Sequence, residues 1–102
     1  MPMLEKTIKS TPLFTKWLRS QKDPKAKATI VSRVQRLKFG LYGDCKSVGS
    51  GVHELRISTG KGYRVYFKER NKQITIVLCG GNKATQQVDI TKAKQLAKDL
   101  NL

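Results

Sequence analysis

The stretch "GYRVYFKER", residues 62–70, alternates polar and apolar side chains, a pattern that predicts a β-strand with one face buried and one face in solvent. The polar face of this strand carries two cations and one aromatic ring, Arg64, Lys68 and Tyr66. Upstream, the segment "HELRI" repeats the alternation and adds Arg56 to the same face. A sheet face lined in this way points to an anion as its ligand.

The neighbouring sequence predicts three antiparallel strands at about residues 52–58, 62–69 and 72–79. If Arg70 and Asn71 form a two-residue turn, Val65 faces Ile76 in the last pair of strands. The Gly-rich loop "STGKG" connects the first pair, and centring it near residue 60 places Arg56 opposite, or nearly opposite, Arg64.

Three segments carry helical signals. "STPLFTKWLRSQ" offers Ser10 or Thr11 as a cap before a proline, and "KDPKAKATIVSRVQRLKFG" has the same signal at Asp23 and ends at Gly40. The short break between these two segments predicts a helical hairpin. The last stretch, "QQVDITKAKQLAKDLNL", has an apolar stripe at helical spacing. The first residues, "MLEKTIKS", are predicted to form an edge strand.

These elements predict an α+β fold in the order β-α-α-β-β-β-α, a single domain over residues 1–102. We expect a small antiparallel sheet with the helices packed on one of its faces. The other face, which carries Arg56, Arg64, Tyr66 and Lys68, is then expected to be open to solvent.

The charge balance is strongly positive, with 21 Lys and Arg against 7 Asp and Glu and a formal net charge of +14. Such an excess favours a polyanionic partner, either nucleic acid or the acidic surface of a protein, although a basic surface without a partner is the alternative. No apolar run of about 18 residues is present, so no membrane span is expected, and no signal-peptide pattern opens the chain.

Cysteine and histidine usage limits the possible chemistry. Cys45 and Cys79 lack a CxxC spacing and are expected to be free thiols of a cytoplasmic protein. With His53 as the sole histidine and no carboxylate cluster, neither a metal site nor a cofactor is expected.

Arginine side chains on the exposed face suit phosphate because their planar fork makes paired hydrogen bonds, and Tyr66 could stack on a base. Lys46 and Lys83 lie in the loops that border the same face and could add phosphate contacts, as could Lys68. The same residues also fit an ordinary solvated sheet face, where lysine and arginine are common.

Two residues are candidates for proton transfer. Asp89 lies near the start of the last helix, where it is either a cap or a site carboxylate. His53 could act as a general base, but its parity places it with Leu55 and Ile57 toward the helices, where a core or rim position is the alternative.

Taken in order, "FTKWL", "DPKAKA", "LKFGLYGDCKSVGSGVHELRI", "GKGYRVYF" and "LCGGNKATQQVDITKAKQLAKDL" resemble the RelE/ParE superfamily of toxins over nearly the whole chain, and most closely its branch of HigB-like addiction-module killer proteins. The resemblance implies a toxin held silent by a cognate antitoxin with a helix-turn-helix domain. It also implies a metal-independent endoribonuclease that cuts mRNA in the ribosomal A site through attack of the ribose 2′-OH on the adjacent phosphate.

Residue roles follow from the same resemblance. Arg64 matches the arginine that contacts the scissile phosphate in RelE-like enzymes, and Lys83 falls near a second arginine of that site. Lys46 and Arg56 are placed to add phosphate contacts.

The chain departs from the pattern where a tyrosine often stands near the last helix, because Asp89 is found there, and the HigB histidines are absent unless His53 serves. ParE-like inhibition of DNA gyrase and RNA binding without catalysis are therefore the alternatives.

Overall fold

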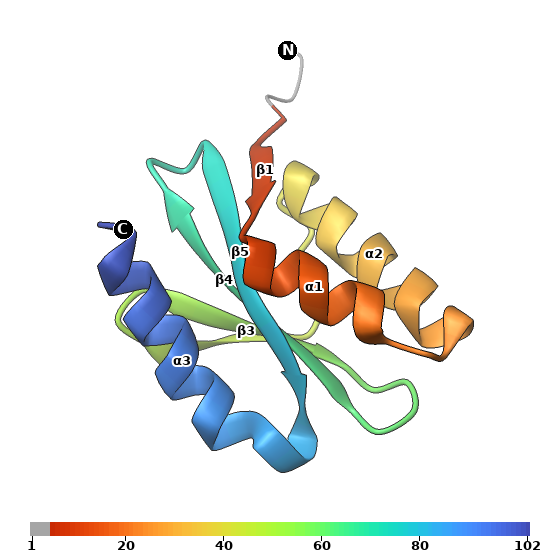
Figure 1. Ribbon diagram of the computed structural model, residues 1–102. Coiled ribbons are helices and arrows are strands. Elements are labelled where there is room, and N and C mark those ends of the chain that lie inside the picture. The colour runs from red at the N-terminus through yellow and green to blue at the C-terminus, as the bar shows by residue number, and fades with distance from the viewer. Residues whose placement is uncertain (1–4) are drawn as a thin grey trace.

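The structure, a computed structural model, describes residues 5–102. It places one sheet between two layers of helices, with α1 and α2 on one side and α3 on the other (Figure 1). In chain order the elements are β1 (Thr7–Ser10), α1 (Pro12–Ser20), α2 (Pro24–Arg36), a 3₁₀ helix (Leu37–Phe39), β2 (Cys45–Gly49), β3 (Val52–Ile57), β4 (Tyr63–Arg70), β5 (Ile74–Asn82), a second 3₁₀ helix (Lys83–Thr85) and α3 (Gln86–Asp99). The predicted α+β class and element order are confirmed, with β2 as an additional strand.

The first two helices form because capping residues and prolines stand at the expected positions. The Thr11 hydroxyl accepts a hydrogen bond from the Phe14 N–H at 3.1 Å, and the Asp23 carboxylate accepts from two N–H groups at the start of α2. Gly40 has the left-handed φ of 72° that ends the second helical segment. The predicted helical hairpin is therefore confirmed.

The sheet is mixed, and its strand order is β1-β5-β4-β3-β2. The predicted edge strand "MLEKTIKS" is confirmed over Thr7–Ser10, whereas residues 3 and 4 of that segment lie outside the described residues. The expected all-antiparallel sheet is wrong at this edge, because β1 runs parallel to β5. At the other edge, β2 forms a hairpin with β3 within a segment whose glycines and serines predict a loop.

The register of the two long hairpins matches the prediction in one case only. Arg56 pairs directly with Arg64 between β3 and β4, as expected. Between β4 and β5 the predicted register is wrong: three residues, 71–73, connect the strands, and Arg70 pairs with Ile74. A loop longer by one residue moves the β5 side chains that precede the bulge at Leu78 to the opposite face, so that Val77 points toward α1 and α2.

A β-bulge limits this difference to the residues of β5 up to Leu78. Tyr66 pairs with Cys79 and Phe67 pairs with Val77, so Leu78 is an extra residue in β5. The bulge allows Leu78 and Cys79, consecutive residues of β5, both to pack on the α3 side.

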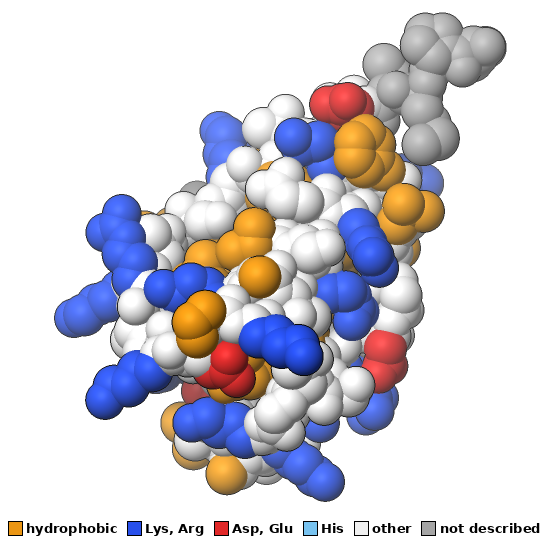
Figure 2. Space-filling model, turned by 90° about the vertical axis from the view of Figure 1, so that its right-hand side faces the viewer, with side chains coloured by type: hydrophobic (Ala, Val, Ile, Leu, Met, Phe, Trp, Pro, Cys, Tyr) orange, Lys and Arg blue, Asp and Glu red, His pale blue; other side chains and the backbone are white. Residues whose placement is uncertain are grey.

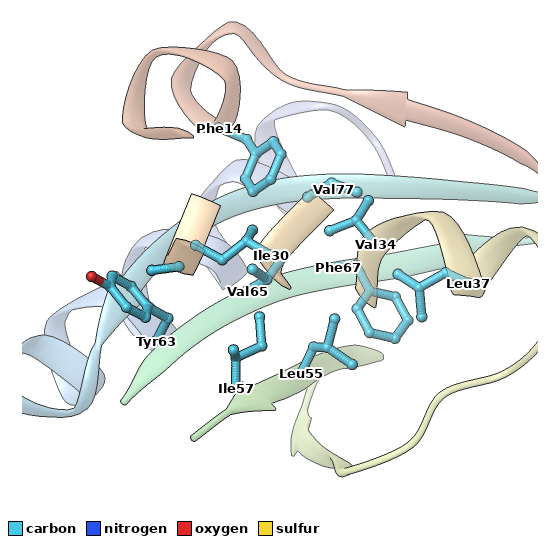
Figure 3. Packing of buried hydrophobic residues seen from close by; sticks show 11 residues of the cluster. Phe14, Ile30, Val34, Leu37, Leu55, Ile57, Tyr63, Val65, Phe67 and Val77 are labelled. Atoms are coloured by element: carbon cyan, nitrogen blue, oxygen red, sulfur yellow. The ribbon is translucent and has the colours of Figure 1, made fainter. Parts of the chain in front are cut away.

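The larger core lies between the sheet and the α1–α2 hairpin (Figure 3). Phe67 lies at its centre, fully buried, and stacks on Tyr42 with ring centroids 6.1 Å apart. The remaining buried members come from both helices, from the first 3₁₀ helix and from β3, β4 and β5: Phe14, Ala26, Ile30, Val34, Leu37, Leu55, Ile57, Tyr63, Val65 and Val77.

The second core corrects the expectation that all helices pack on one face. Ala93 and Ala97 of α3 pack on Val52, Tyr66, Leu78 and Cys79, all on the opposite side of the sheet. Small alanine side chains let the helix backbone approach the strands closely. The face that was expected to be open to solvent is therefore covered along part of its length by α3.

One charged network lies on the α1–α2 side. Lys6 donates hydrogen bonds to Tyr42 and Glu69, and the Tyr42 hydroxyl donates to Glu69 Oε1 at 2.8 Å. Burial raises the pKa of Glu69, but the hydrogen bonds from Lys6 and Tyr42 outweigh it and leave that pKa below its ordinary value. Burial likewise lowers the pKa of Lys6, and the bonds to Glu69 and Tyr42 leave it above its ordinary value.

Candidate functional site

A pair of arginines lies side by side on the α3 side of the sheet. Arg56 of β3 and Arg64 of β4 are register partners, and Arg64 pairs in turn with Gly81 of β5. Like charges placed directly opposite each other destabilise a sheet, so this pair indicates either a neighbouring carboxylate or an anionic ligand. We use "arginine site" for these two residues and the three that surround them, Glu54, Tyr66 and Gln86.

Glu54 is the carboxylate of the site, and none of its side chain is exposed. Its Oε2 atom accepts hydrogen bonds from the Tyr66 hydroxyl at 3.0 Å and from Gln86 Nε2 at 2.8 Å. Its Oε1 atom lies 3.5 Å from Arg56 Nε, an ion pair without hydrogen-bond geometry. Glu54 therefore neutralises part of the local positive charge and connects β3 to the first turn of α3.

Unsatisfied polar atoms gather at the arginine site. Within residues 5–102, four buried side-chain N or O atoms lack a hydrogen-bond partner, and three of them are Glu54 Oε1, Arg56 Nε and Arg64 Nε. The fourth is Thr75 Oγ1. Buried polar atoms without partners are rare in folded proteins, so each of these atoms calls for a partner such as a ligand, an ion or a water molecule.

Tyr66 differs from its sequence interpretation. It is fully buried beneath α3, so it offers no face on which a base could stack. Burial, followed by the hydrogen bond to Glu54, raises the pKa of the Tyr66 hydroxyl far above its ordinary value. Tyr66 therefore keeps its proton and acts as a fixed donor to Glu54.

Two of the predicted lysines border the arginine site. Lys46 is exposed on β2 and is the register partner of Glu54, which places it on the same side of the sheet as Arg56 and Arg64. Lys83 is exposed just beyond the end of β5, and its N–H donates to the Gly62 carbonyl at 2.9 Å. That bond ties the start of the β5–α3 connection to the loop before β4, the strand that carries Arg64.

Lys68 lies on the α3 side but away from the arginine site. It is four residues beyond Arg64 along β4, or about 13 Å at the usual rise of a strand. Its ammonium group donates to the carbonyl oxygens of Ser50 at 3.1 Å and Leu102 at 2.9 Å. Lys68 is therefore held at the opposite end of α3.

The two acid–base candidates fall on different sides of the sheet. Asp89, 7% exposed, accepts a hydrogen bond from the Thr85 hydroxyl and packs on Gly81, where a Cβ atom would lie 1.8 Å from its Oδ2 atom. Because Gly81 is the strand partner of Arg64, this places Asp89 beside the arginine site. His53 instead stacks on Phe67 on the α1–α2 side, with ring centroids 5.4 Å apart.

Neither thiol is activated. Both cysteines are free, as expected. Burial, together with the charge of Asp89, raises the pKa of the Cys79 thiol to about 12, and burial raises that of Cys45 as well. Within residues 5–102 no group of three or more His, Cys, Asp and Glu side chains is placed to hold a metal ion.

Positive charge is spread beyond the arginine site. Lysine and arginine side chains also cover the side of the molecule formed by α1 and α2, with few acidic groups between them (Figure 2). The distribution of positive charge therefore does not identify the site. The pairing of Arg56 with Arg64 and their Nε atoms without hydrogen bonds identify it. No helix in the described part of the chain is both long and apolar enough to cross a membrane.

Sequence reasoning missed Gln86, whereas it places Glu54 on the same face as Arg56 and Arg64, where its carboxylate could lie between them. Glu54 shares the parity of Arg56, which was the available signal for its position. Gln86 carried no such signal, because its contact depends on α3 covering this side of the sheet.

Comparison with known proteins gives matches in sequence and in fold. Residues 16–100 match the family described as phage derived protein Gp49-like (DUF891). An uncharacterized protein of Haemophilus influenzae is 53% identical over 95 residues, which cover 93% of this chain and 96% of the relative.

Two toxin structures share the fold. A mutant of the Escherichia coli toxin RelE in the free state superposes with a TM-score of 0.71 at 13% identity, covering 89% of this chain and 97% of the toxin. A chain of the toxin–antitoxin complex RelBE2 from Mycobacterium tuberculosis superposes with a TM-score of 0.65 at 18% identity, covering 81% of this chain and 97% of that one. At these identities the likeness establishes the RelE fold.

Proposed function

Because the chain belongs to the phage-derived Gp49-like family and has the fold of RelE toxins, we propose that it is the toxin of a type II toxin–antitoxin module. As a toxin domain it would act on mRNA bound to the ribosome in the cytoplasm, cutting the message and stopping translation. The observation that carries this proposal is the arginine site, where two paired guanidinium groups have buried Nε atoms without a hydrogen bond, that of Arg56 facing Glu54 in an ion pair and that of Arg64 having no such carboxylate.

The proposed reaction needs a clamp on a phosphate. The ribose 2′-OH attacks the adjacent phosphorus, the bond to the 5′ oxygen of the next nucleotide breaks, and the products are a 2′,3′-cyclic phosphate and a 5′-OH. Negative charge grows on the phosphoryl oxygens in the transition state, and preorganised cations stabilise it. In this proposal Arg64 and Lys83 supply that clamp, while Arg56 and Lys46 hold flanking phosphate oxygens.

Proton transfer is the second requirement. Asp89 lies on the same side of the sheet as Arg64 and is the proton acceptor that we propose for the 2′-OH. His53 does not fit this role, since it stacks on Phe67 across the sheet. If the ribosome orients the RNA, a weak base is sufficient to accept the 2′-OH proton.

The proposed partner is a cognate antitoxin, with a helix-turn-helix domain as the family resemblance implies. Support comes from the similar RelBE2 structure, which is a toxin–antitoxin complex. A net charge of +14 favours an acidic antitoxin segment, because charge complementarity speeds and selects association.

Inhibition of DNA gyrase is the second candidate. It is favoured by the burial of Tyr66 and the position of His53, which leave the arginine site without an exposed phenol or imidazole for proton transfer. A gyrase inhibitor of the same fold would not need either group.

Controlled expression tests the proposal. The wild-type chain, Arg64→Ala and the matched control Arg70→Ala, an exposed arginine at the far end of the same strand, are induced while mRNA 5′ ends are mapped on translating ribosomes. We expect new ends within the A-site codon for the wild type and Arg70→Ala, and none for Arg64→Ala. Growth arrest with intact mRNA and stalled replication would contradict mRNA cleavage and support gyrase inhibition.

A further inference from the structure

A pocket opens at the end of the sheet on the α1–α2 side, across the sheet from the arginine site. It has a volume of about 510 Å³, within the range of small-ligand sites, and lies between the α1–α2 connection and the loop before β4. Its lining combines aromatic rings, lysines and backbone: Trp17, Lys22, Lys61, Tyr63, Gly81 and Asn82. Neither the sequence interpretation nor the proposed reaction uses this pocket.

Two aromatic rings form the apolar wall of the pocket. Trp17 meets Tyr63 edge to face, with ring centroids 6.3 Å apart and planes at 69°. Tyr63 is 4% exposed, whereas the indole of Trp17 is only partly buried. Glycine at position 80 lets the indole lie directly against the sheet, because a Cβ atom there would be 2.3 Å from Trp17 Cε3. The pocket therefore presents an indole in a fixed position.

The rim of the pocket is polar and mostly cationic. Lys22 and Lys61 are both exposed there. The carboxylate of Asp23 also lines the pocket, but it caps α2 by accepting from the N–H groups of Lys25 and Ala26. An aromatic wall beside lysines suits a nucleotide, whose base stacks on the ring and whose phosphate meets the ammonium groups.

Asn82 adds a hydrogen-bond donor. Its Oδ1 atom accepts from the N–H groups of Ala84 and Thr85, at 2.8 and 3.2 Å, which fixes the orientation of the amide. In the described part of the chain its amide nitrogen makes no hydrogen bond, so it is available to a base edge in the pocket.

The pocket and the arginine site share the end of β5. Gly81 lines the pocket and is also the strand partner of Arg64. Asn82, the next residue, pairs with Tyr63 of the pocket wall. Trp17 and Tyr63 lie on the α1–α2 side of the sheet and Arg64 on the α3 side, so an RNA chain that contacts both has to pass around the end of the sheet near Asn82.

We propose that this pocket binds the base of a nucleotide in the same RNA that Arg64 contacts, with Trp17 as its stacking platform. The inference rests on the proposed function, since it adds a base subsite to the same RNA path. It assigns to Trp17 and Lys61 a role in positioning the RNA and to Arg64 the contact with the reacting phosphate.

Tryptophan fluorescence tests the proposal directly, because Trp17 is the only tryptophan in the sequence. The purified full chain is titrated with nucleoside monophosphates, ribose 5-phosphate and inorganic phosphate. We expect saturable quenching by the nucleotides and none by the other two compounds. Equal quenching by ribose 5-phosphate, or no quenching by any nucleotide, would overturn the proposal.

Two variants separate this proposal from the proposed function. Lys61→Ala removes an exposed side chain and should weaken nucleotide binding about fivefold, whereas Arg64→Ala should leave mononucleotide binding unchanged. Loss of quenching in Arg64→Ala would place the nucleotide on the arginine site and overturn the pocket assignment. Saturable quenching without mRNA cleavage in cells would refute the proposed nuclease activity and support nucleotide binding in the pocket. Cleavage without quenching would support the nuclease activity and refute nucleotide binding in the pocket.

Discussion

The two sides of the sheet are built from alternating residues of the same strands, yet they bury different kinds of groups. On the α1–α2 side, Phe67 lies in an apolar core, and the one charged network there, Lys6 with Glu69 and Tyr42, is paired. On the α3 side, a buried glutamate and two arginines lie together with three unsatisfied atoms. The first side holds the larger apolar core, and the second combines a smaller core with the features expected of a binding site.

The largest effect is expected from Phe67→Ala. Phe67 is fully buried and contacts Tyr42 and His53, so its truncation leaves a cavity in the larger core. We expect a loss of about 3–5 kcal/mol in the free energy of unfolding, measured by urea denaturation. A loss below about 1 kcal/mol would contradict the placement of Phe67 in this core.

A smaller effect is expected from Tyr66→Phe, the neighbouring residue on the opposite side. The variant keeps the ring but removes the donor to Glu54, a carboxylate that already has one unpartnered oxygen. We expect a loss of about 1–3 kcal/mol in the free energy of unfolding. Stability equal to that of the wild type would show that Glu54 does not depend on this bond.

The two sides of the sheet also show which features can be predicted from the sequence and which cannot. Period-2 and period-3.6 patterns, proline positions and caps were sufficient for the helical hairpin, the α+β class and the pairing of Arg56 with Arg64. These features depend on local sequence and on one short hairpin. The position of α3 depends instead on contacts between Ala93, Ala97 and strands far away in the chain, which no local pattern specifies.

Single-residue differences account for the other errors. The connection between β4 and β5 holds three residues where two were expected, which reverses the facing of β5 up to the bulge at Leu78, and the bulge restores the expected facing beyond it. The burial of Tyr66 then follows from α3. The cationic residues of the site were found because charge and strand parity can be read from sequence, whereas their unsatisfied atoms depend on side-chain placement.

The smallest effect concerns pH. The pKa of Glu69 is lowered in the folded protein, so its contribution to stability is present above the unfolded pKa of about 4.3 and is lost as pH falls through the folded value. The pKa of Lys6 is raised, so its contribution is present below about 10.4 and is lost as pH rises through the folded value. We expect a stability plateau between these limits.

Comparison of the wild type with Glu69→Gln isolates this effect from the general repulsion of a basic protein. The difference in unfolding free energy between the two should be greatest near pH 7 and should shrink below about pH 4. A difference that stays constant from pH 7 to pH 3 would show that Glu69 is not paired in the way described.

The most direct test of the account measures cleavage by the purified chain on ribosomes programmed with a defined mRNA. Arg64→Ala removes a guanidinium from the arginine site, and Arg70→Ala removes one from the exposed end of the same strand. We predict that Arg64→Ala lowers the single-turnover rate by about 10²–10³ with little change in melting temperature, while Arg70→Ala cleaves like the wild type. Equal rates for Arg64→Ala and the wild type would contradict the assignment of the arginine site.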